Sequence, residues 1–250
     1  MSGLLLAGDV YIDRYDDNGL STGLVGPLNA TQLQINTPSE SKDRPSKRKG
    51  SYGQALDSVT LAQATEVTIV FDDQPTEMLA MAMMGDFEEQ NQSAGTATET
   101  LITLPKSNRW AALVHRNLTN AGVVALLAAD DSPIADTGYE INYADGLIRT
   151  VPGGALDTGT PTPIKLTYTF MAVNKTVIKG GIKPTIKARI LLKGVNLANS
   201  KGVECDILEA SLAPTQAVDL LASEYVSTTL AGKVILRDGE TAAFYLTQDK

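Results

Sequence analysis

Runs in which apolar and polar residues alternate recur along the whole chain, and they constrain its fold more than any other feature. A period of two places successive side chains on opposite faces of a strand, so each run predicts a strand with one face in a core. The Asp145–Gly146 pair lies between two of these runs and predicts a hairpin. The runs are Leu33–Thr37, Glu66–Phe71, Tyr139–Tyr143, Leu147–Val151 and Ile164–Phe170. The sequence therefore predicts a mainly all-β fold.

The remaining secondary-structure signals are consistent with such a fold. Further strands are expected over 186–192, 203–208 and 233–236, with the turn-rich segment 193–202 between the first two. The clearest helix signal covers 75–84. Pro75 suits its first turn, an acidic or amide side chain at 72–74 can cap it, and Gly85 suits its end. Its methionines are interpreted as core packing, with an adaptable subunit interface as the alternative. A weaker helical turn is expected at 216–221.

Two polar or glycine-rich stretches divide the chain. Residues 87–100 contain few apolar side chains and are the best candidate for a linker. A second break at 173–184 contains Gly180, Gly181 and Pro184. The two breaks predict a β-rich inserted subdomain over 96–178. The flanking parts, 1–95 together with 179–250, are then expected to form one β-sandwich or barrel core.

The segment Ser39–Gly53 differs in charge from the rest of the chain. It holds five cations and two acids, so its net charge is +3, whereas the chain carries −8 and the remainder therefore −11. The cations are Lys42, Arg44, Lys47, Arg48 and Lys49. We interpret the segment as a long basic loop between two strands. It is expected to dock onto an acidic surface, for which another copy of the chain is a candidate.

Composition argues against several classes of function. A pI of about 4.7 is unlike that of a protein that clamps nucleic-acid phosphates with a basic face. One cysteine rules out an intramolecular disulfide. Aromatic residues make up 5% of the chain, which leaves little to hold a sugar or a base. The sequence predicts neither a signal peptide nor a membrane-spanning helix, and hence synthesis in a cytoplasm.

No catalytic, cofactor-binding or metal-binding residue is predicted. One histidine and one cysteine cannot form a zinc site. His115 lies in a strand-like run and is expected to be structural or solvent-facing, and Cys205 is expected to pack in the core. The acids between Asp9 and Asp17 resemble a calcium loop only faintly, since the terminal glutamate is absent. They are interpreted as part of a solvated arm.

The order of these pieces resembles the major tail tube proteins of long-tailed bacteriophages. The resemblance covers nearly the whole chain as a layout, although no single motif is diagnostic. It is carried by an N-terminal arm (4–15), a glycine-anchored entry into the first strand (24–33), the basic loop (39–53), the strand and short helix (66–85), the hairpin (139–148) and a late strand and turn (188–196). The region 96–178 departs from a minimal tube domain.

The resemblance implies a structural virion protein and not an enzyme. Its fold would be a tail-tube β-sandwich that forms hexameric rings, stacked into a hollow tube through which DNA passes into the host without specific binding. The implied partners are further copies of the chain and other tail proteins, such as the tape measure, tail terminator and distal tail proteins. No membrane partner is implied, and the location would be the phage tail, assembled in the host cytoplasm.

The five cations are assigned to the contact between rings. Electrostatic attraction would steer their docking onto the acidic body of the next ring.

Three other interpretations of the chain's function remain open: a monomeric phage decoration or receptor-binding β-module, a carbohydrate hydrolase on a β-sandwich, and a soluble β-domain of another role. Size measurement separates the first from a tube subunit, and a hydrolase would need paired acids in a pocket with aromatic walls.

Overall fold

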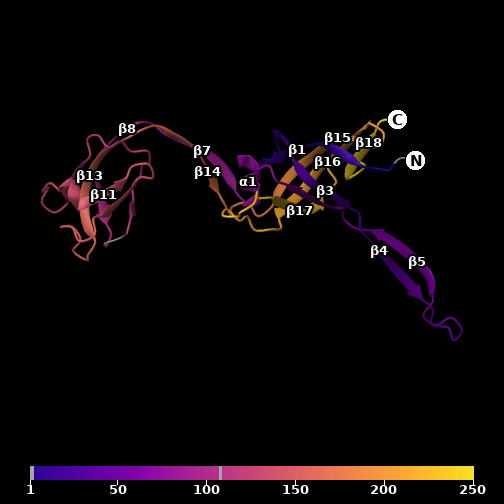
Figure 1. The fold of residues 1–250 in the computed structure, drawn as a ribbon. Helices are drawn as coiled ribbons and strands as arrows, with labels where there is room; N and C mark the ends of the chain where they lie inside the picture. The colour runs from indigo at the N-terminus through magenta and orange to yellow at the C-terminus, as the bar shows by residue number, and fades with distance from the viewer. Residues whose placement is uncertain (1–2, 107–108) are drawn as a thin grey trace. The chain divides into compact units, whose positions relative to one another are not determined.

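The computed structural model describes residues 3–106 and 109–250. Strands dominate it and α1 (Thr76–Ala82) is the one α-helix among these residues, which confirms the all-β prediction. The chain folds as two compact units (Figure 1). Unit 1 combines the segments up to Phe87 and from Ile178 onward, and unit 2 covers Glu88–Val177.

Unit 1 is built on an eight-stranded antiparallel sheet. Its order is β2-β1-β15-β16-β17-β6-β3, and β18 also pairs with β16. The strands are β1 (Leu6–Tyr15), β2 (Ser21–Leu28), β3 (Ala30–Asn36), β6 (Glu66–Phe71), β15 (Ile186–Asn196), β16 (Lys201–Pro214), β17 (Thr228–Val234) and β18 (Phe244–Gln248). The predicted strands at 186–192 and 203–208 are therefore confirmed, and both extend into the segment expected to be their connection.

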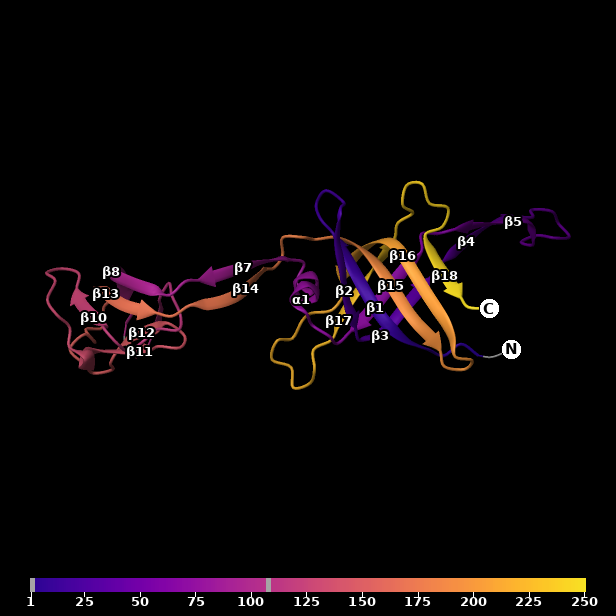
Figure 2. The same ribbon diagram turned by 90° about the horizontal axis from the view of Figure 1, so that it is seen from above.

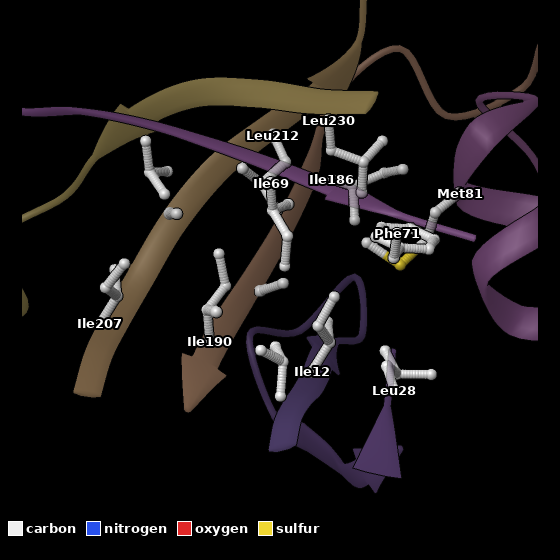
Figure 3. Close-up of a cluster of buried hydrophobic side chains, with 14 of the residues drawn as sticks. Ile12, Leu28, Ile69, Phe71, Met81, Ile186, Ile190, Ile207, Leu212 and Leu230 are labelled. Atoms are coloured by element: carbon white, nitrogen blue, oxygen red, sulfur yellow. The ribbon is translucent and has the colours of Figure 1, made fainter. Parts of the chain in front are cut away.

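The sheet curls around one core, and we call this curled sheet the barrel (Figure 2). Its two end strands, β2 and β3, are separated in the chain by Asn29 alone, which joins one edge of the sheet to the other. Figure 3 shows the side chains inside. Every strand of the path supplies some of them, among them Ile12, Leu28, Ile69, Ile190, Leu212 and Leu230, with Leu33 packed at the margin. Burial of this apolar surface is the main source of stability for such a unit.

The N-terminal segment is a central strand, so the expectation of a solvated arm is wrong for Asp13, whereas Asp9, Asp16 and Asp17 are exposed as expected. Residues 6–15 form β1, which pairs with β15 on one side and β2 on the other. Asp13 is buried. Its carboxylate accepts hydrogen bonds from Ser21 Oγ at 2.6 Å, Thr22 N at 3.1 Å and Gly23 N at 2.9 Å. The acid is thus buried at low cost because its oxygens have partners.

Helix α1 lies where the sequence predicts it, but its caps differ. Pro75 is the N-cap residue, and no side chain caps the helix. The carboxylates of Asp72 and Asp73 instead accept hydrogen bonds from Asn29, at 2.8 and 2.7 Å.

At the end of the helix, Met84 and not Gly85 has the positive φ, which is 49°. A Cβ on Gly85 would lie 2.4 Å from the Lys179 carbonyl oxygen, so close packing explains this glycine. Met78 and Met81 are fully buried, as predicted, whereas Met84 is exposed. The turn expected at 216–221 is not helical.

The predicted linker is a strand. Residues 86–92 form β7 (Asp86–Gln92), which pairs with β14 (Val173–Lys179) in a two-stranded ribbon. Both predicted breaks are therefore largely ordered by backbone hydrogen bonding to each other. The sequence signal fails here because an exposed ribbon has no buried face and needs no apolar alternation.

Unit 2 contains two three-stranded sheets around a core of its own. One has the order β10-β13-β8 and the other β11-β12-β9. The strands are β8 (Gly95–Leu104), β9 (Ala111–Ala112), β10 (Val124–Leu127), β11 (Tyr139–Asn142), β12 (Leu147–Thr150) and β13 (Thr162–Phe170), with a 3-10 turn at Asp136–Gly138. The β11–β12 hairpin confirms the Asp145–Gly146 prediction, and Gly146 has a φ of 65°. The core includes Leu104, Ile148, Ile164, Leu166 and Tyr168.

One side-chain oxygen in this core has no hydrogen-bond partner among the described residues. Thr150 is 1% exposed, and its Oγ1 is unsatisfied. Burying a hydroxyl without a partner costs about 1–3 kcal/mol. Thr150→Val keeps the branched shape and removes the hydroxyl, so we expect the free energy of unfolding to rise by about 0.5–2 kcal/mol. Chemical denaturation followed by circular dichroism measures this change.

The control for this substitution is Thr167→Val. The Thr167 hydroxyl accepts a hydrogen bond from the Glu99 amide at 3.0 Å. Its removal should leave stability unchanged or lower it. A stability gain of equal size in both variants would show that valine is favoured for its strand propensity, and that the unsatisfied hydroxyl of Thr150 costs nothing.

Candidate interaction surface

The basic segment lies on a two-stranded hairpin that projects no side chain into a core. Strand β4 (Ser39–Pro45) pairs with β5 (Ala55–Ala62), and all residues of both strands are exposed. The hairpin forms a sheet of its own, so neither of its edges is paired with another strand. Isolated two-stranded hairpins are marginally stable in water. Such an element gains stability when another surface covers it.

The cations fall into two groups along this hairpin. Lys42 lies opposite Val59 and Arg44 lies opposite Asp57, and directly opposed residues share a face of an antiparallel pair. Lys47, Arg48 and Lys49 lie together in the connecting tip, and all five side chains belong to exposed residues. The structure thus brings the five predicted residues onto one element, with two on a strand face and three at the tip.

The tip is held by hydrogen bonds around a buried serine. Ser46 is 1% exposed. Its amide donates to the Gln54 carbonyl at 2.7 Å, and its own carbonyl accepts from the Gly53 amide at 2.9 Å. Its hydroxyl lies 2.7 Å from Ser51 Oγ and accepts from the Arg48 amide at 3.2 Å. These bonds fix the backbone that carries the three tip cations.

None of the five cations forms an ion pair with any residue in 3–106 or 109–250. Even Arg44, whose register partner is an acid, makes no ion pair with it. Elsewhere the chain pairs its charges across strands, as in Arg189–Asp206 at 2.6 Å and Lys187–Glu209 at 3.0 Å. The hairpin therefore presents positive charge that its own copy does not neutralise.

The prediction of a long loop over 39–53 is wrong for its first half. Residues 39–45 form β4, because a backbone ladder to β5 forms whatever side chains the strand carries. Sequence reasoning also missed four exposed apolar residues on the same hairpin: Tyr52, Leu56, Val59 and Leu61 are 78%, 48%, 53% and 41% exposed. The alternation of Val59 and Leu61 resembles that of a core strand. The basic composition of β4 was the sequence signal that could have shown that the β4–β5 hairpin does not cover a core.

The other candidate residues take structural positions. The predicted strand at 110–116 is reduced to β9, and His115 follows it. The His115 ring stacks on Phe170 with centroids 3.7 Å apart, and its Nδ1 lies 3.0 Å from the Tyr168 hydroxyl. Cys205 is buried as predicted, and burial raises the pKa of its thiol.

In the described parts of the chain no group of histidine, cysteine and acidic residues could hold a metal ion. No helix there is long and apolar enough to cross a membrane.

Comparison with known proteins places the chain in a family. No curated protein matches it. A family model described as "Protein of unknown function UCP028589" matches residues 4–243, which includes both units and the hairpin. Because this match covers nearly the whole chain, the protein belongs to the family of that description.

Proposed function

We propose that this chain is a structural subunit of a bacteriophage tail tube. Copies would form hexameric rings, and the rings would stack into a hollow tube for passage of DNA during genome ejection. The order of sequence motifs supports the proposal, as does the all-β architecture of both units. Ring closure and stacking need two different contacts between copies, and a projecting hairpin suits the second.

The β4–β5 hairpin, whose two strands are exposed along their whole length, is the observation that carries this proposal. It is ordered by its own backbone bonds, buries no side chain of its strands and presents unpaired cations together with exposed Val59 and Leu61. A monomer gains little from such an element, whereas an assembly gains a contact. The acidic remainder of the chain fits a tube wall along which DNA slides without phosphate binding.

Assembly of the purified protein tests the proposal. We expect light scattering to report particles far above 26.5 kDa as concentration rises, and negative-stain electron microscopy to show rings or tubes. Subunit contacts that rely on exposed charges should weaken as salt is raised. A species of 26.5 kDa at every concentration, with and without tail-assembly partners, would contradict the proposal and favour a monomeric decoration or receptor-binding module.

A further inference from the structure

We propose that the β4–β5 hairpin of one copy docks on one particular surface of a second copy, which we call the helix end of the barrel. Tyr52 at the hairpin tip would enter an open cavity beside α1, and the tip cations would face the exposed acids of the same end. This inference rests on the proposed function, because it requires that copies of the chain assemble. It adds the receptor surface and an anchor residue, neither of which follows from the hairpin alone.

The strand register defines the helix end. In the β15–β16 pair, Asn196 lies opposite Lys201 at one end and Ile186 opposite Leu212 at the other. Strand β1 finishes at this second end, where Arg14 pairs with Ala188, and β17 begins there, where Leu230 pairs with Pro214. Helix α1 lies at the same end, away from both chain termini (Figure 2).

The helix end carries acids that its own copy leaves without a cation. Within the described residues the exposed acids here that form no ion pair are Asp16, Asp72, Asp73, Asp219 and Glu224. Neighbouring Asp17 and Asp86 are neutralised, by Lys183 and Arg14 respectively. Five unpaired acids at this end thus match the five unpaired cations of the hairpin. Complementary charge of this kind orients two surfaces and speeds their association.

A cavity of about 510 Å³ opens at this end of the barrel, and Asp219 directly follows its lining residue Val218. It is lined by Ala82 at the end of α1, by Met83 and Met84 that follow the helix, by Gly180 and Gly181, and by Pro214–Val218. Its walls present more apolar than polar surface, and it is open to solvent, so a side chain of another copy can reach it. The loop that continues from Val218 to Val226 carries Asp219 and Glu224 and no cation.

Tyr52 is the residue of the hairpin best suited to this cavity. It is the one aromatic residue in the hairpin sequence 39–62, and it is 78% exposed next to the tip cations. Tyrosine is enriched among residues that dominate binding energy, because its ring buries apolar area while its hydroxyl stays hydrogen-bonded. An apolar hollow whose last lining residue, Val218, leads into the loop of Asp219 and Glu224 matches a tip that combines one aromatic ring with three cations.

Charge exchange between the two surfaces tests the inference. Lys47→Glu, Arg48→Glu and Lys49→Glu together should raise the concentration needed for assembly at least about tenfold, because attraction becomes repulsion. Asp219→Lys with Glu224→Lys should have a similar effect. Combining both sets in one chain should return assembly to within about threefold of the original protein. Sedimentation velocity over a concentration series measures all of these, and circular dichroism checks the fold of each variant.

Matched variants separate a specific contact from a change in net charge. Lys175→Glu, Lys201→Glu and Lys250→Glu change the charge of other exposed residues by the same amount and should shift the assembly concentration by less than about twofold. Tyr52→Ala should raise it about tenfold, whereas Tyr52→Phe should not.

The outcomes distinguish this inference from the proposed function. If the original protein assembles but the Asp219/Glu224 variant behaves like the charge control, or if the combined variant is not rescued, the helix end is not the receptor. The proposed function then stands. If the original protein remains a monomer throughout, the proposed function fails, and this inference fails with it.

Discussion

Gly232→Ala should be among the most destabilising single substitutions in unit 1. Gly232 lies in β17 with Leu212 on one side and Val67 on the other. A Cβ at this position would lie 1.7 Å from the Ser211 carbonyl oxygen. Backbone atoms cannot move aside as the end of a side chain can, so β16 and β17 would have to separate. We expect a loss of about 3 kcal/mol or more in the free energy of unfolding.

Thermal denaturation measures this loss. For a chain of this size about 3 kcal/mol corresponds to a fall in Tm of roughly 6–12 °C. Gly50→Ala is the matched control, because a Cβ there meets nothing within 4 Å and the residue is exposed. It should shift Tm by less than about 2 °C. Equal shifts for the two variants would mean that β17 can move without cost and that the close approach is not a constraint.

The close packing at Gly232 also shows a kind of constraint that cannot be predicted from the sequence. Gly232 lies next to a predicted strand at 233–236, and nothing local distinguishes it from a glycine in a turn. Its role follows from the twist of three paired strands, which is a property of the folded sheet. The β11–β12 hairpin is the opposite case, since its turn residues and both alternating strands are adjacent in sequence. Local signals of this kind can be predicted, whereas contacts between distant strands cannot.

The candidate surface likewise combines features that the sequence predicts with features that it does not. Its cations were predictable, because a +3 segment in a chain of −8 is visible in composition. The pairing of β4 with β5 was not, since neither strand has a buried face to impose periodicity. Asp13 shows the converse error. The sequence indicates a solvent-facing acid, but Asp13 is buried, because three donors at the start of β2 converge on its carboxylate. Burial of a polar group depends on partners that the sequence does not identify.

The two units should lose stability separately when their cores are damaged. Ile190 lies in the unit 1 core and Ile164 in the unit 2 core, and each is 0% exposed. Truncation to alanine removes three buried carbons and leaves a cavity, which costs about 2–5 kcal/mol in either site. Because each core is contained within its own unit, the cost should fall on that unit and not on the other.

Hydrogen exchange of the full chain, read by mass spectrometry, distinguishes these effects. Ile164→Ala should speed exchange in the strands of unit 2, β8 and β13 above all, and leave β15 and β16 as slow as before. Ile190→Ala should do the reverse, so that each variant is the control for the other. Exchange that rises throughout the chain in both variants would mean that the two cores unfold as one cooperative unit. A tube subunit whose barrel is locked into an assembly would then transmit damage in unit 2 to the contact between copies. Separate responses would mean that unit 2 can vary without disturbing the barrel, which is what the proposed function expects of a region added to a minimal tube domain.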